Sequence, residues 1–269
     1  MALLKGNDLT GLIGPLVLKK GNGGRTIVQT KAREYKQNKE SKRSAKMFGY
    51  GSSVAGAIRR ELHSTIGMGY DPGMVNRFNT PVRAVLNHCW NKQEGAFKFE
   101  QDSFNRLAEF EFNIKSPLIN FLWVKPTMTL EANTLTVTIP AFEVPSQFTF
   151  PRGTNVCNVT VTISQINITQ AITKYELYFA FEVTSDQQSH PAREFEFAVE
   201  NECLCIAAIG LSYTQRYQGV TTVFNSKTFS PANIIDAIIT PGLYVKPPLP
   251  AVYHTTKGQD WSYCPSLKF

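Results

Sequence analysis

The feature that most constrains this chain is a regular alternation of apolar and polar residues that begins after about residue 95. Leu135, Val137 and Ile139 alternate with threonines, and the same pattern recurs at 159–163 and 175–183. Successive side chains of a strand point to opposite faces, so such segments are typical of half-buried antiparallel strands. Roughly eight of them without intervening helical patterns predict a mainly β (α+β) fold built on an antiparallel β-sandwich, immunoglobulin-like or jelly-roll-like.

Before residue 95 the apolar residues recur at helical spacing instead. Apolar residues three or four positions apart from Phe48 to Ile66 predict one helix, and those from Met74 to Cys89 predict a second. Asp71-Pro72 is a suitable start for the second helix. Pro81 lies inside that pattern and should kink or divide the helix, because proline cannot donate the backbone hydrogen bond.

Residues 11–30 are typical of a β-hairpin. An apolar run from Leu12 to Leu18 is followed by Gly21-Asn-Gly-Gly24 and then by a β-branched segment. Glycine and asparagine tolerate the positive φ angles of a tight reversal. The glycines do not form a phosphate-binding loop, because Arg25 and a strand follow them where Gly-Lys-Ser/Thr and a helix would be needed.

These patterns divide the chain into three regions. Residues 1–94 form a basic N-terminal region with the hairpin and two helices, and residues 95–240 form the sandwich. Residues 241–269 are predicted to be an extended C-terminal arm, because their prolines cannot donate to a β-ladder.

Four segments of the first 90 residues carry a resemblance to a known family. They are Gly11-Leu-Ile-Gly14-Pro-Leu-Val17, the reversal from Gly21 into Arg25-Thr-Ile-Val28, the polar basic stretch before Phe48, and Asn76-Arg-Phe78-Asn79. In them the chain resembles an uncharacterised protein family of Bacteroidota, a domain of unknown function with a glycine-rich N-terminal hairpin and an all-β body. Pro15 in the first strand and the proline-rich tail depart from that pattern. The resemblance implies this layout and brings no activity or site with it.

Charge is distributed unevenly along the chain. Its 28 lysines and arginines against 21 acidic residues give a net charge of +7, but residues 1–60 hold 13 basic and three acidic residues, a balance of +10, which leaves −3 for the rest. A basic segment of this kind can neutralise phosphates without reading sequence, or can contact an acidic protein surface. The candidate residues for contact with a polyanion or a neighbouring subunit are Lys31, Arg33, Lys36, Lys39, Lys42, Arg43, Lys46, Arg59 and Arg60.

No catalytic or metal-binding pattern accompanies the basic segment. The four histidines are far apart in sequence, and neither a Cys-x-x-Cys pair nor a Gly-x-Ser-x-Gly motif occurs. His88 and Cys89 should point about 100° apart on a helix, a poor start for a nucleophile. Carboxylates two residues apart, such as Glu109 and Glu111, are interpreted as the solvated side of a strand. We therefore expect no enzyme activity, cofactor or metal, and five buried, reduced cysteines.

The same sequence contains neither a recognisable secretory signal nor an apolar run of the roughly 18 residues needed to span a membrane, which predicts cytoplasmic synthesis. The leading hypothesis is a non-catalytic structural subunit that assembles with copies of itself into a particle, tube or filament, such as a phage or virus-like capsid or tail component of a virion. The alternative is a nucleic-acid-binding accessory protein that uses the basic segment, although Tyr35 and Tyr50 are its only stacking surfaces. A carbohydrate-binding or cell-surface-binding module using Trp123, Trp261 and Tyr263 is a third possibility.

Overall fold

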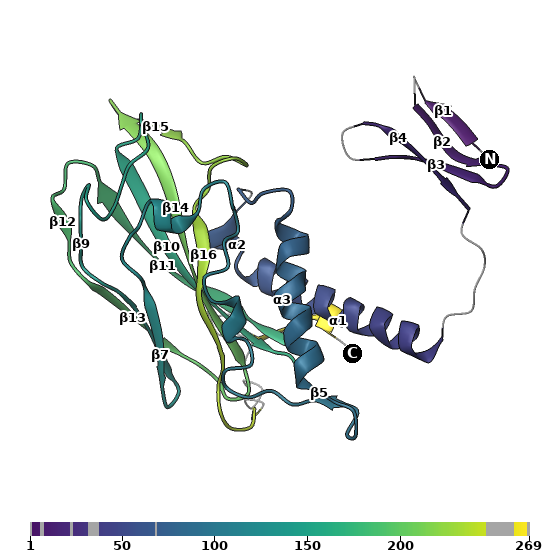
Figure 1. Ribbon diagram of the computed structural model, residues 1–269. Coiled ribbons are helices and arrows are strands. Elements are labelled where there is room, and N and C mark those ends of the chain that lie inside the picture. The colour runs from purple at the N-terminus through teal and green to yellow at the C-terminus, as the bar shows by residue number, and fades with distance from the viewer. Residues whose placement is uncertain are drawn as a thin grey trace, which may run out of the picture. The chain divides into compact units, whose positions relative to one another are not determined.

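A computed structural model describes residues 2–5, 8–21, 24–31, 38–67, 69–245 and 261–267 (Figure 1). Contacts divide the chain into two units, Met1–Ser44 and Ala45–Phe269, which are described separately below. The mainly β class predicted from the alternation is confirmed, with antiparallel sheets in both units.

The first unit is a four-stranded antiparallel meander, with strands β1 (Ala2–Lys5), β2 (Asp8–Ile13), β3 (Leu16–Lys20) and β4 (Thr26–Thr30). The predicted reversal after Gly21 joins β3 to β4, where Gly24 N–H donates to the Gly21 carbonyl over 3.2 Å. The apolar run that was predicted to be one strand is two strands. Gly14, with φ +53°, and Pro15 form the turn between them, so Pro15 does not stand within a strand.

Three helices follow, α1 (Lys39–Glu61), α2 (His63–Ile66) and α3 (Met74–Cys89). Helix α1 begins nine residues before the predicted start at Phe48, because Asn38 caps it by accepting a hydrogen bond from Ser41 N–H at 2.7 Å. Pro81 was predicted to kink or divide this helix, and α3 continues through it, so the division does not occur. The buried Phe78 and Val82 on either side of the proline anchor this helix in the core.

The main sheet of the second unit has the strand order β15-β14-β10-β11-β17, and β16 also pairs with β14. Its longest strands are antiparallel neighbours at the centre, so that β10 pairs with β11 on one side and β14 on the other. The strands are β10 (Val156–Asn167), β11 (Ile172–Thr184), β14 (Leu204–Tyr217), β15 (Val220–Val223), β16 (Ala232–Ile239) and β17 (Trp261–Tyr263).

A smaller sheet covers one face of the main sheet. It contains β13 (Arg193–Ala198), β8 (Thr134–Ile139) and β7 (Thr127–Glu131) in that order. The apolar positions that alternate with the threonines, such as Leu135 and Val137, share a core with Val159 and Val161 of β10. The remaining short elements are β5 (Trp90–Asn91), β6 (Ala96–Phe97), β9 (Phe142–Glu143), β12 (Ser189–His190) and the 3₁₀ turns η1 (Asn105–Leu107), η2 (Leu118–Asn120) and η3 (Pro265–Leu267).

The helices cover the other face of the main sheet. Ile58 of α1, Leu62 at the start of α2 and Phe78 of α3 belong to one core with Ile206 and Ala208 of β14. The second unit is therefore layered as small sheet, main sheet and helices (Figure 1). Because the helices share a core with the strands, residues 45–94 belong to the same unit as the sandwich, and the boundary expected near residue 94 differs from the division at Ser44.

The C-terminal segment differs from the expected arm where the structure describes it. Residues 261–263 form β17, which pairs with Ile172 to Lys174 of β11. Cys264 and Leu267 then enter the helical core, each no more than 3% exposed. Most of the proline-rich stretch, residues 246–260, lies outside the described residues.

Candidate functional site

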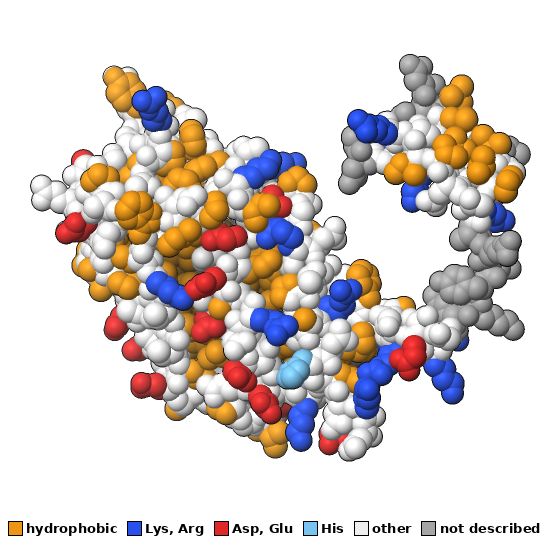
Figure 2. All heavy atoms as spheres, viewed as in Figure 1, with side chains coloured by type: hydrophobic (Ala, Val, Ile, Leu, Met, Phe, Trp, Pro, Cys, Tyr) orange, Lys and Arg blue, Asp and Glu red, His pale blue; other side chains and the backbone are white. Residues whose placement is uncertain are grey.

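Residues 39–46 of the basic segment form the first two turns of helix α1. Lys39, Lys42, Arg43 and Lys46 are all exposed, and at about 100° per residue they share one face of the helix about 100° wide. We call these four residues the basic stripe. Among the described residues, Lys39 and Lys42 form no ion pair. Arg43 Nη1 lies 4.0 Å from Glu40 Oε2. The Lys46 ammonium lies 5.3 Å from the centre of the Tyr50 ring. Basic side chains gather over α1 in Figure 2.

Arg59 and Arg60 do not belong to this surface. Arg59 donates to Asn79 Oδ1 at 3.1 Å, and burial lowers the pKa of its guanidinium. Arg60 donates from Nη2 to Cys264 Sγ at 2.8 Å, which ties the end of α1 to the C-terminal segment. These two arginines therefore hold the fold together and are separated from the basic stripe by the length of the helix.

The remaining candidates lie nearer the N-terminus. Lys31 is exposed just after β4, and its backbone N–H donates to the Pro15 carbonyl at 2.6 Å. Arg33 and Lys36 lie outside the described residues. The structure thus brings four of the nine predicted residues together on one helical face.

The N-terminal sheet carries a second unusual surface. Its register places Leu4, Leu9, Ile13, Leu16, Leu18 and Val28 on the same face. We call this the apolar face; the opposite face is mixed, because Leu3, Leu12, Val17 and Ile27 alternate there with Thr10, Lys19 and Gln29. None of the described apolar side chains of residues 3–31 is buried, and Leu4 and Val28 remain 72% and 56% exposed. A sheet of this size normally needs its hydrophobic face covered to be stable, and the four described strands do not provide that cover themselves.

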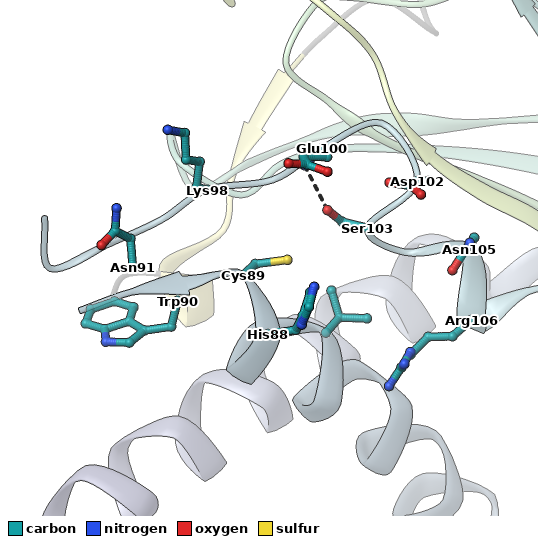
Figure 3. A pocket seen from close by; sticks show the side chains of 11 residues that line it. His88, Cys89, Trp90, Asn91, Lys98, Glu100, Asp102, Ser103, Asn105 and Arg106 are labelled. Carbon is teal, nitrogen blue, oxygen red and sulfur yellow. Dashed lines mark hydrogen bonds between the residues drawn. The ribbon is translucent and has the colours of Figure 1, made fainter. Parts of the chain in front are cut away.

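A pocket of about 400 Å³ lies where α3 ends, and it contains the His88-Cys89 pair (Figure 3). His88 is exposed and Cys89 is buried, with its sulfur directed toward Ser103. Burial raises the pKa of the Cys89 thiol, and the negative charges of Glu100 and Asp102 raise it further. A hydrogen bond with Ser103 acts in the opposite direction and lowers this pKa. The thiolate is therefore disfavoured here, which does not suit a nucleophile.

The carboxylates Glu109 and Glu111 differ from the prediction that both line the solvated side of a strand. Glu109 is exposed, has a φ of 63° and forms an ion pair with Lys125. Glu111 is partly buried in an apolar pocket of about 290 Å³ and accepts the Leu118 N–H at 3.1 Å. Burial raises the pKa of the Glu111 carboxyl to about 7. Sequence spacing could not reveal this, because the pocket is built by the distant η2 turn and β16.

An ion pair that the sequence analysis missed joins the start of α3 to a later loop. Asp71 is 3% exposed and accepts hydrogen bonds from Arg77 Nη2 at 2.5 Å, Gly73 N–H at 2.8 Å and Ile114 N–H at 3.3 Å. Burial by itself would raise the pKa of Asp71, but these donors together lower it. Asp71 is therefore a structural anchor rather than a simple helix cap.

The cysteines are all free and buried. Burial raises the pKa of Cys203 to about 12 and raises those of Cys157 and Cys205 as well. Within the described residues, no group of three or more His, Cys, Asp or Glu side chains could hold a metal ion. Of the helices that the structure describes, none combines the length and apolarity required to cross a bilayer.

Comparisons with protein-family models, with curated proteins and with solved structures give no match to this chain. Its function therefore has to be argued from its own surfaces, of which the apolar face and the basic stripe are the two most unusual.

Proposed function

We propose that this chain is a non-catalytic structural subunit that assembles with copies of itself into a larger homo-oligomer, such as a particle, tube or filament. The observation that carries the proposal is the apolar face of the N-terminal sheet. Full burial of a leucine, isoleucine or valine side chain is worth about 1.5–3 kcal/mol, so covering this face would stabilise a contact between subunits substantially. A capsid or tail component of a phage or virus-like particle is the concrete case that we favour.

Self-assembly fits the contrast between the two units. Exposed contiguous apolar surface on a soluble protein commonly marks an interaction site. The sheet of one N-terminal unit can be covered by a neighbouring copy, and each copy then both provides and receives such a contact. In this arrangement the N-terminal sheet gains its missing hydrophobic core from assembly.

Sedimentation velocity of the full chain from about 1 to 100 μM tests this proposal, because mass action makes association depend on concentration. We expect larger species to grow with concentration and to appear as regular particles in negative-stain micrographs. Serine at Leu4, Leu16 and Val28 should shift the distribution toward monomer. A control with serine at Thr10 and Gln29, which lie on the opposite face, should behave as the wild type. A wild-type chain that stays monomeric throughout would refute the proposal.

A nucleic-acid-binding accessory function is the alternative, and the basic stripe favours it. Four closely spaced cations could neutralise several phosphates and would give a steep dependence of affinity on salt. Binding of a fluorescent single-stranded oligonucleotide, compared between the wild type and a variant with glutamine at the four stripe residues, tests this function. Unchanged affinity in the variant would exclude the stripe as the binding surface.

A further inference from the structure

The outer face of the small sheet is a polar surface of unusual uniformity. Its register places Thr134, Thr136 and Thr138 of β8 beside Glu194 and Glu196 of β13, while Glu131 and two threonines of β7 flank the other side. The opposite face of the same strands is the buried one, with Leu135, Val137 and Phe197. We call the outward surface the acidic face.

The acidic face carries three negative charges and no positive one. Glu131, Glu194 and Glu196 are exposed, and none of them forms an ion pair within the part of the chain that the structure describes. In Figure 2, acidic side chains form a row at the left margin of the second unit, over β13 and β7. By contrast, Glu109, Glu182 and Glu200 elsewhere on the unit are each paired with a cation.

The basic stripe is complementary to this face in charge and in size. From Lys39 to Lys46 the stripe extends about 10 Å along the helix axis. Strand spacing separates Glu194 from Glu196 by about 7 Å and places Glu131 roughly 12 Å from Glu196. Long lysine and arginine side chains can bridge such differences, and the threonines between the glutamates are smaller than the glutamate side chains.

We propose that the basic stripe of one copy binds the acidic face of a second copy. This inference rests on the proposed function, for which it names a second contact in addition to the apolar face. The contact is heterologous, because two different surfaces meet, and repetition of such a contact generates rings or filaments. Charge complementarity favours a second copy over nucleic acid as the partner of the basic stripe, because the same chain carries both the basic stripe and the acidic face.

Charge reversal provides the test. One variant carries glutamate at Lys39, Lys42, Arg43 and Lys46, and a second carries lysine at Glu131, Glu194 and Glu196. Sedimentation velocity measures the protein concentration at which half of the chains are associated. For each variant by itself, this concentration should be about ten-fold or more above that of the wild type. An equimolar mixture should recover to within about three-fold of the wild type, because each stripe then meets a face of opposite charge.

A matched control reverses four other exposed cations, with glutamate at Lys92, Lys115, Arg152 and Lys227. It changes the net charge equally and should associate as the wild type. Glutamates near a helix N-terminus are favourable, so the stripe variant should fold, and far-UV circular dichroism checks this. A salt titration of the wild type needs no variant: screening should weaken this contact, while contact through the apolar face should persist.

The outcomes separate the two proposals. If the wild type associates while both reversed variants associate equally well and salt has no effect, this inference is wrong and the proposed function stands. If the wild type does not associate at all, both fall. If reversal of the stripe abolishes oligonucleotide binding and leaves association unchanged, the stripe is a nucleic-acid surface and the inference is likewise overturned.

Discussion

In the N-terminal sheet no described apolar side chain of residues 3–31 is buried, whereas β10 and β14 of the second unit are buried on both faces over most of their length. Both regions are antiparallel and rich in β-branched and aliphatic residues. They differ in what lies against them: β10 and β14 have a second sheet on one side and helices on the other. The N-terminal strands are paired through backbone hydrogen bonds, while their described apolar side chains are not buried.

The difference teaches that hydrogen-bonded pairing and hydrophobic burial are separate requirements. A ladder fixes register, while burial of apolar area supplies most of the stability. The second unit meets both requirements within one chain. The strands of the first unit are paired by hydrogen bonds but do not bury their described apolar side chains. For this reason we assign the apolar face to a contact between copies.

The largest expected effect belongs to the buried side of this comparison. Phe78→Ala, at a ring that is fully buried against Phe110 and Phe112, should lower the free energy of unfolding by about 3–5 kcal/mol. Urea denaturation followed by tryptophan fluorescence measures it. Phe48→Ala, at a phenylalanine that is 55% exposed, is the control and should cost less than about 1 kcal/mol. A loss of unfolding free energy in Phe78→Ala as small as that in Phe48→Ala would mean that the helical core contributes little to stability.

The next effect concerns the anchor of α3. Asp71→Asn should destabilise the second unit by about 2–4 kcal/mol at pH 7, because it leaves Arg77 without its charged partner. The pKa of Asp71 is lowered in the folded state, so its contribution is full above the unfolded value near 4 and is lost as the pH falls through the folded value. The difference between wild type and variant should therefore shrink in acid. Asp102→Asn, at an exposed aspartate, should show no such difference.

Glu111 should give a smaller effect of opposite sign. Its pKa is raised to about 7 from 4.5, so the folded state binds the proton more tightly and stability falls as the pH rises through that window. Glu111→Gln should remove this dependence and gain about 1–2 kcal/mol at pH 8, allowing for partial solvent exposure. Denaturation at pH 5 and pH 8 measures the change. Glu109→Gln is the exposed control, and a pH dependence that survives in Glu111→Gln would contradict the assignment.

The smallest effect is expected in the N-terminal sheet. Leu16→Ala should change the unfolding of the second unit by less than about 0.5 kcal/mol in dilute solution, because Leu16 is 40% exposed. All three tryptophans lie in the second unit, so their fluorescence reports that unit by itself. A loss as large as that of Phe78→Ala would show that the sheet stabilises the second unit and would remove the contrast between them.

Sequence reasoning succeeded where one short-range pattern determines the structure. The alternation at Leu135 to Ile139 identified β8 and its buried face, and the spacing from Met74 to Cys89 identified α3. It failed where the deciding partner is distant or where the signal is not hydrophobic. Helix α1 begins among charged residues that have no apolar period, and the sequence analysis did not identify Asn38 as its cap.

The candidate surfaces were predictable to a similar extent. The charge balance identified Lys39 to Lys46, but only the fold separates them from Arg59 and Arg60, which contact Asn79 and Cys264. The Glu111 pocket was missed because its walls come from η2 and β16, far along the chain. Similarly, nothing in the composition of the tail indicates that Trp261 to Tyr263 pair with β11.

The buried cysteines make this chain convenient for site-specific labelling. All five thiols are free and enclosed, so alkylating reagents should leave the native protein unmodified while it stays folded. A single cysteine introduced at the exposed Lys42 or at Thr134 would then be the only reactive thiol on the surface. Fluorophores placed at these two positions on different copies would report energy transfer when the copies meet, without removal of any native cysteine.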